Sequence, residues 1–234
     1  MLLPHDRFQC VKYGICWLGP SFQLKDDSLI FFLLLIGSQW LEATVTGPDL
    51  VCIVIFRGSW CKYDKHYLTK LGEHYISTMK AENVQIIAWT SEGEEGALRA
   101  DTEWGLTKQY GYAAVLGDET NALANWLIED ELLPKLVIAT PEEAHVADIL
   151  PDGSTYPNGI VMPGMVWYAH HGNPVFEWTK KMEPPGYGGP GRPDPVALWE
   201  TVLKRKHALD SGNCVMPSHG TEMKMCSTDA DVDL

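Results

Sequence analysis

The sequence predicts an α/β fold in which helices flank a central β-sheet. Residues 50–56 (LVCIVIF) form an almost unbroken apolar run, which is typical of a central strand covered on both faces. From Asp49 onward, short β-branched runs alternate with longer helical stretches. At 234 residues, 45% of them hydrophobic and 21% charged, the chain has the composition and length of a globular domain with extensions.

The first half of the expected domain contains two strands and two helices. After the apolar run, residues 63–80 favour a helix, and Val84–Trp89 favours a second strand. Thr90, Ser91 and Glu92 then provide a capping region for a second helix that reaches about Tyr110.

The second half contains shorter elements. We expect weaker strands at 113–116 and 136–139, separated by a helix at 121–127. The turn-rich stretch 151–159 follows, and then the segments 165–169 and 174–178 flank His170-His171-Gly172-Asn173 and favour a β-hairpin.

A last helix follows a loop rich in glycine and proline at residues 184–195. Asp194 is an expected N-cap, Pro195 suits the first turn, and residues 196–206 form the helix. The predicted organisation is an N-terminal extension (1–45), a domain (46–207) and an acidic, mobile tail (208–234).

The charge and the cysteines exclude several classes of protein. Lys and Arg number 18 against 31 Asp and Glu, so the net charge of −13 argues against nucleic-acid binding. The apolar run 29–36 is well short of the roughly 20 residues that a spanning helix needs, so a membrane-tethered form is only a secondary alternative. The six cysteines are scattered, which predicts a reducing compartment, the cytoplasm, and neither a disulfide scaffold nor a zinc site.

Three motifs carry a family resemblance: FRGSWC at 56–61, YPNGIVMPG at 156–164 and GGPGRPDP at 188–195. In this order they resemble the peroxiredoxin-like branch (AhpC/TSA-related) of the thioredoxin-like superfamily, over about residues 49–207. The resemblance implies the three-layer thioredoxin-like fold. It also implies an antioxidant enzyme of cell redox homeostasis, with Cys61 as the nucleophile and Pro163 as a cis-proline facing it.

Cys61 is nucleophilic only as a thiolate, which a helix N-terminus alone stabilises too little. The Ser59 hydroxyl and the Arg57 guanidinium are the candidate thiolate partners, together with the adjacent Lys62. Asp64, one helical turn after Cys61, opposes them because a second negative charge raises the thiol pKa.

Asp64 also stands where many family members have a second cysteine, and Gly58 stands where typical peroxiredoxins have a threonine. We therefore expect a one-cysteine type that takes a hydroperoxide or a disulfide, without a cofactor. An external thiol such as glutathione or thioredoxin, or Cys214 or Cys226 of the tail, resolves the oxidised cysteine. The alternative is a thioredoxin-like interaction module without redox activity, and whether the chain forms a homodimer stays open.

The remaining candidates have simpler explanations. Cys52 is expected to be a core residue. The cysteines, methionines and histidine of the tail (214–226) lack regular spacing, so no metal site is expected. The glycine-rich loop 186–191 is expected to be structural, although Arg192 faces the active site if that loop folds over it.

Overall fold

The structure is a computed structural model, and it describes residues 8–10, 16–18, 49–151, 156–169, 173–181 and 191–211. The chain divides into two units, residues 1–36 and 37–234. In the first unit, β1 (Phe8–Cys10) pairs antiparallel with β2 (Cys16–Leu18). The apolar run 29–36, the histidine pair 170–171 and the cysteines of the tail lie outside the described residues.

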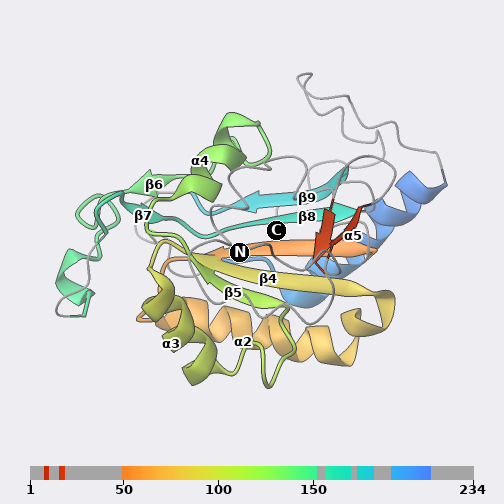
Figure 1. Ribbon diagram of the computed structural model, residues 1–234, viewed down its shortest axis with the longest axis horizontal. Helices are drawn as coiled ribbons and strands as arrows, with labels where there is room; N and C mark the ends of the chain where they lie inside the picture. Colours follow the sequence, from red (N-terminus) through yellow and green to blue (C-terminus); the bar gives the residue numbers. More distant parts are fainter. Residues whose placement is uncertain are drawn as a thin grey trace, which may run out of the picture. The chain divides into compact units, whose positions relative to one another are not determined.

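The second unit is built on a five-stranded sheet with the order β5-β4-β3-β8-β9 (Figure 1). In chain order, its strands are β3 (Leu50–Phe56), β4 (Val84–Thr90), β5 (Ala114–Gly117), β8 (Gly164–Ala169) and β9 (Asn173–Thr179). β3, β4 and β5 run parallel, whereas β8 is antiparallel to both β3 and β9. The sheet is therefore mixed, and the predicted hairpin is β8–β9.

The central strand β3 is buried on both faces, as its unbroken apolar run predicts. Leu50, Cys52, Val54 and Phe56 belong to the hydrophobic cluster on one face of the sheet. The alternate residues, 51, 53 and 55, belong to the cluster on the other face. This alternation is the period of two expected of a strand that carries a helical layer on each side.

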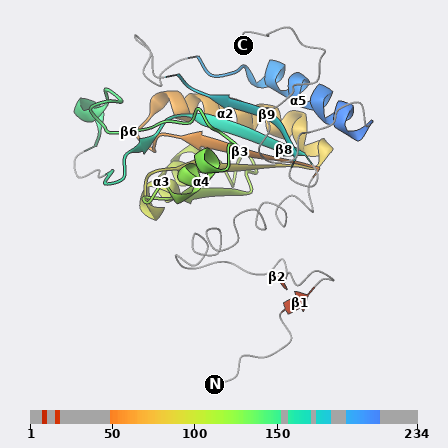
Figure 2. The ribbon, with the colours of Figure 1, turned by 90° about the horizontal axis from the view of Figure 1, so that it is seen from above.

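Helices pack on both of these clusters. α2 (Lys62–Ser77), α3 (Glu94–Trp104) and α5 (Pro195–Asp210) contribute side chains to the first cluster. α4 (Ala122–Glu129) contributes to the second. Figure 2 shows α2 and α5 on one side of the sheet and α4 on the other, which is the predicted three-layer arrangement.

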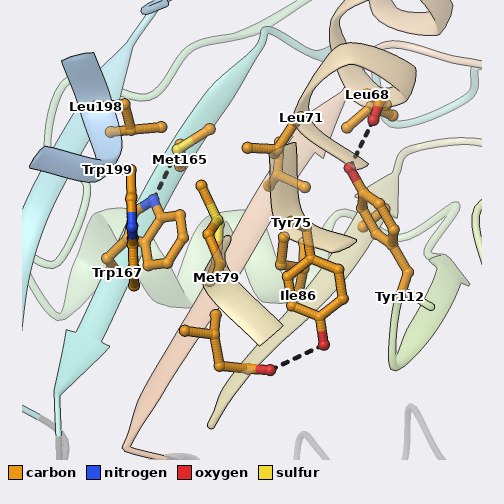
Figure 3. Packing of buried hydrophobic residues seen from close by; sticks show 14 of the residues in the cluster. Leu68, Leu71, Tyr75, Met79, Ile86, Tyr112, Met165, Trp167, Leu198 and Trp199 are labelled. Carbon is orange, nitrogen blue, oxygen red and sulfur yellow. Dashed lines mark hydrogen bonds between the residues drawn. The ribbon is translucent and has the colours of Figure 1, made fainter. Parts of the chain in front are cut away.

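The first cluster joins α5 to the hairpin through aromatic contacts. The Trp167 indole N–H donates to the sulfur of Met165 at 2.9 Å, and Trp199 of α5 packs on Trp167 with ring centroids 6.0 Å apart (Figure 3). These contacts fix α5, and with it the residues that precede it, against the sheet.

Several helix boundaries differ from prediction. α2 ends at Ser77 and the 3-10 helix η2 (Met79–Glu82) follows it. α3 ends at Trp104 because Gly105 adopts φ +69 and its N–H bonds the Asp101 carbonyl, a glycine C-cap inside the predicted helix. α5 is capped by Asp194 as predicted, but it continues to Asp210, into the segment predicted as tail.

An insertion of short elements separates α4 from the hairpin. β6 (Ile138–Ala139) and β7 (Ile160–Val161) form a separate antiparallel pair, with the 3-10 helix η3 (Ala147–Ile149) between them. The chain in this region encloses its own small apolar cluster, which includes Ile160 and Met162. This cluster lies next to the segment that leads from β3 to α2, because Trp60 packs against it.

Candidate functional site

Cys61 lies where the chain passes from β3 into α2, as the sequence predicts. Phe56 ends the strand, and Cys61 is the N-cap of the helix with an extended backbone (φ −83, ψ 106). Its N–H donates to the Gly58 carbonyl at 3.0 Å, and its carbonyl accepts from the Lys65 N–H at 3.0 Å. Only 3% of the residue is exposed, so the thiol is held under a tight turn rather than presented on the surface.

Arg57 supplies the positive charge nearest to this thiol. Its Nη2 donates to the sulfur of Cys61 at 2.9 Å, and its guanidinium lies 5.3 Å from the centroid of the Trp60 ring. Because Arg57 is 3% exposed, water screens this contact little. The sequence singled out Arg57 as a thiolate partner, and the structure brings the two groups together.

Asp64 belongs to the segment that joins β3 to the first turn of α2 (residues 56–64, the Cys61 corner), and it contacts two arginines. Its Oδ2 accepts the Arg57 backbone N–H at 3.0 Å and lies 3.8 Å from Arg57 Nε. Its Oδ1 is bonded by Nη2 of Arg192, whose guanidinium lies 5.9 Å from the centroid of the Tyr67 ring. Asp64 is 1% exposed, so the segment preceding α5 is tied to the Cys61 corner by a buried ion pair.

The electrostatics of this corner contain two opposing influences. Burial and the negative charge of Asp64 raise the pKa of the Cys61 thiol to about 11, whereas the positive charge of Arg57 lowers it. Arg57 contacts both the thiol and Asp64, whereas Arg192 contacts Asp64. Because buried charges are stable only when compensated, the Arg57 contact favours the thiolate against burial.

Ser59, the other predicted thiolate partner, bonds elsewhere. Its backbone N–H and its hydroxyl both donate to the carboxylate of Glu92, the hydroxyl at 3.1 Å. The single hydroxyl proton is therefore directed at Glu92 and not at the sulfur of Cys61. A role for Ser59 in stabilising the thiolate stays a prediction.

Glu92 was not identified as a site residue from the sequence, because its place before a helical stretch is typical of a helix cap. Glu92 follows β4, which is parallel to β3, and the carboxyl ends of parallel strands lie at one edge of a sheet. Thr90 fixes the two strand ends together, since its hydroxyl donates to the Arg57 carbonyl at 3.2 Å and accepts the Glu92 N–H at 3.2 Å. Ser59 follows β3 and Glu92 follows β4, so an expectation that these two strands are parallel neighbours would have placed Glu92 beside Ser59.

Pro163 precedes β8 and lines the same small pocket as Asp64. Its carbonyl accepts the Lys180 N–H at 2.8 Å, and the preceding Met162 donates its N–H to the Val137 carbonyl. A small pocket joins β3, α2 and the start of β8, and it is lined by Val54, Ile55, Phe56, Asp64, Tyr67, Leu68, Pro163, Gly164, Trp178 and Arg192. The isomer of the bond before Pro163 and its part in shaping a substrate groove stay predictions.

Two other predictions concern cysteine and metal chemistry. Cys52 is fully buried in the core on β3, as predicted, and burial raises the pKa of its thiol. Within the described ranges, no three His, Cys, Asp or Glu side chains gather in a group that could hold a metal ion. In the same ranges, no helix has the length and hydropathy to cross a membrane.

Comparison of the sequence finds no matching family model and no matching curated protein. Solved structures with a similar fold include AhpC of Enterococcus faecalis, at 14% identity and a TM-score of 0.50, covering 75% of this chain and 84% of that one. They also include the reduced 2-Cys peroxiredoxin of Plasmodium vivax, at 12% identity and a TM-score of 0.43, with 78% of each chain covered. A yeast mitochondrial 1-Cys peroxiredoxin matches at 10% identity and a TM-score of 0.42, covering 79% of this chain and 74% of that one.

The likeness to AhpC confirms the predicted fold: the second unit has the thioredoxin-like fold. At this level of identity the comparison concerns the fold alone. The chemistry of the site must therefore be argued from the residues around Cys61.

Proposed function

We propose that the protein is a thiol-dependent oxidoreductase of the one-cysteine type, in which Cys61 attacks a hydroperoxide or a disulfide. The observation that carries the proposal is the 2.9 Å contact from Arg57 Nη2 to the Cys61 sulfur at the N-terminus of α2. A hydrogen bond from a charged donor typically contributes about 1.5–3 kcal/mol, more than the roughly 0.3–1 kcal/mol of a helix end. Arg57 is therefore the main stabiliser of a Cys61 thiolate.

With a hydroperoxide, the thiolate attacks the terminal oxygen, so that an S–O bond forms and the O–O bond breaks. The products are a sulfenic acid at Cys61 and an alcohol or water. Two equivalents of an external thiol then reduce the sulfenic acid, giving a disulfide, water and the restored thiol. By the family resemblance, Asp64 stands where many members have a second cysteine. The reductant in our proposal is therefore glutathione, thioredoxin or a thiol of the tail, and the setting is cytoplasmic antioxidant defence.

The test is consumption of hydrogen peroxide by the purified chain with glutathione as the thiol donor. The parent and a Cys52→Ala variant are expected to consume peroxide at similar rates, because Cys52 is enclosed in the core. Cys61→Ser is expected to reduce the rate to that of glutathione alone. If Cys61→Ser consumes peroxide as fast as the parent, Cys61 is not the nucleophile.

A second candidate function is an interaction module of the same fold without redox activity. The raised pKa of Cys61, about 11, favours it, because only about one thiol in 10,000 is then ionised at pH 7. The rate of Cys61 alkylation against pH separates the two functions. An inflection near pH 6 supports the enzyme, and an inflection above pH 8.5 in both free protein and protein mixed with a thiol donor supports the module.

A further inference from the structure

Tyr156 lies against the turn that carries Cys61, although it is far away in sequence. Its hydroxyl oxygen accepts the indole N–H of Trp60 at 2.6 Å. The bond crosses Gly58, where an added Cβ would lie 2.7 Å from the Tyr156 oxygen and closer still to Trp60 Nε1. A glycine is therefore required at position 58 for the Tyr156 hydroxyl to reach the turn.

The rest of the chain holds Tyr156 in this place. Its ring and that of Trp60 pack against the small apolar cluster of the β6–β7 insertion. The turn after Tyr156 is closed by the Gly159 N–H, which donates to the Tyr156 carbonyl at 3.0 Å. The side-chain amide of Asn121 donates to the carbonyls of Asn158 and Gly159 at 2.7 and 3.0 Å, so the turn is anchored to the N-terminus of α4.

We propose that Tyr156 is the proton donor to the leaving oxygen when Cys61 reacts with a hydroperoxide. This inference rests on the proposed function and adds a residue to it. Because the Tyr156 oxygen already accepts the Trp60 N–H, the phenolic proton is left to point at another acceptor. The Trp60 bond thus fixes the oxygen and orients the proton.

The carboxylate of Glu92 belongs to the same turn, since it accepts the backbone N–H and the hydroxyl of Ser59, and the charges of Glu92 and Cys61 both act on the Tyr156 hydroxyl. Burial and these two groups raise the pKa of Tyr156 well above its ordinary value, so the phenol keeps its proton at neutral pH. An alkoxide is much more basic than a carboxylate, so a leaving oxygen competes successfully for the proton.

The Cys61 thiolate bonds to the terminal O–H oxygen of the hydroperoxide, the O–O bond breaks, and sulfur is oxidised as the oxygens are reduced. The leaving oxygen takes the Tyr156 proton and departs as an alcohol. The tyrosinate regains a proton from solvent, which received one when the Cys61 thiol ionised. A hydroperoxide therefore needs the tyrosine, whereas a peroxy acid, which releases a weakly basic carboxylate, does not.

The test is Tyr156→Phe, which removes the hydroxyl and keeps the ring. Tyr63→Phe is the matched control, because Tyr63 is 41% exposed on α2. Single-turnover oxidation of Cys61 is measured with tert-butyl hydroperoxide and with peroxyacetic acid, and alkylation of Cys61 by iodoacetamide is measured in parallel. A general acid typically contributes at least about 100-fold to such a step.

We expect Tyr156→Phe to lose about 100-fold with tert-butyl hydroperoxide and to react like the parent with peroxyacetic acid and iodoacetamide. An equal loss with all three reagents would show that Tyr156 only maintains the structure of the turn, which overturns the inference. An unchanged rate with the alkyl hydroperoxide overturns it as well. If the parent is inert to both oxidants but is alkylated normally, the proposed function itself fails, and the inference fails with it.

Discussion

Replacing Asp64 by Asn is expected to make Cys61 more acidic. Asn keeps the shape of the side chain and an oxygen that can accept the Arg57 backbone N–H, now 3.0 Å from Oδ2. It removes the negative charge, which is one of the causes of the raised thiol pKa. It also leaves the guanidinium groups of Arg57 and Arg192 without the carboxylate that they share.

The size of this effect follows from the geometry. One guanidinium group bridges the two acids, because Arg57 Nη2 contacts the Cys61 sulfur and Nε faces Asp64. Two negative charges about 4–6 Å apart repel by about 3–4 kcal/mol at an effective dielectric constant of about 20. At about 1.4 kcal/mol per pKa unit, the pKa of Cys61 falls from about 11 by at least about two units. The thiolate fraction at pH 7 then rises about 100-fold or more.

The assay is alkylation of Cys61 by iodoacetamide at a series of pH values, followed by mass spectrometry of the peptide that contains it. Glu103→Gln is the matched control, because it removes one acidic charge from an exposed position on α3. Circular dichroism checks that each variant is folded, since loss of a partner from a buried ion pair typically costs about 3–5 kcal/mol. If folded Asp64→Asn is alkylated at the parent rate or more slowly, the electrostatic account of the corner is wrong.

Two further predictions concern stability. If Cys61 has the raised pKa of about 11 that favours the interaction module, instead of 9.0, the folded state holds the thiol proton more tightly, and the unfolding free energy should fall by roughly 3 kcal/mol between about pH 9 and about pH 11. An enzyme whose thiol titrates near pH 6 should show no such fall. Chemical denaturation of the parent and of Cys61→Ser at pH 8 and pH 11 measures this, and an equal loss in both would contradict it. Gly58→Ala should destabilise the protein by about 1–3 kcal/mol, because the new methyl overlaps Trp60 and Tyr156. A melting temperature equal to that of the parent would show that the turn adapts without cost.

The local features of the site could be predicted from the sequence. The run 50–56 is apolar at every position, which identifies a strand buried on both faces, and the cysteine follows at the start of a helical stretch. Strand, turn and helix N-terminus are adjacent in the chain, so Cys61 and Arg57 are placed by short-range rules alone. The Asp194 cap of α5 was predictable for the same reason.

The long-range partners were not predictable in the same way. Arg192 and Asp64 lie 128 positions apart, and Trp60 and Tyr156 lie 96 apart. Nothing in the local pattern around Glu92 distinguishes a helix cap from a carboxylate that receives two bonds from Ser59. These contacts depend on strand order and on the packing of the β6–β7 insertion, which are properties of the whole fold.

The proposed function depends on reaction of the Cys61 sulfur with a hydroperoxide. Trapping of the sulfenic acid with dimedone after one equivalent of hydrogen peroxide at pH 7, followed by peptide mapping, tests this reaction directly. We expect a dimedone adduct on the Cys61 peptide of the parent and none on the corresponding peptide of Cys61→Ser. If Cys61 stays unmodified in folded parent protein, and the peroxide is left unconsumed or the adduct lies on another cysteine, then Cys61 is not the residue that reacts with the hydroperoxide.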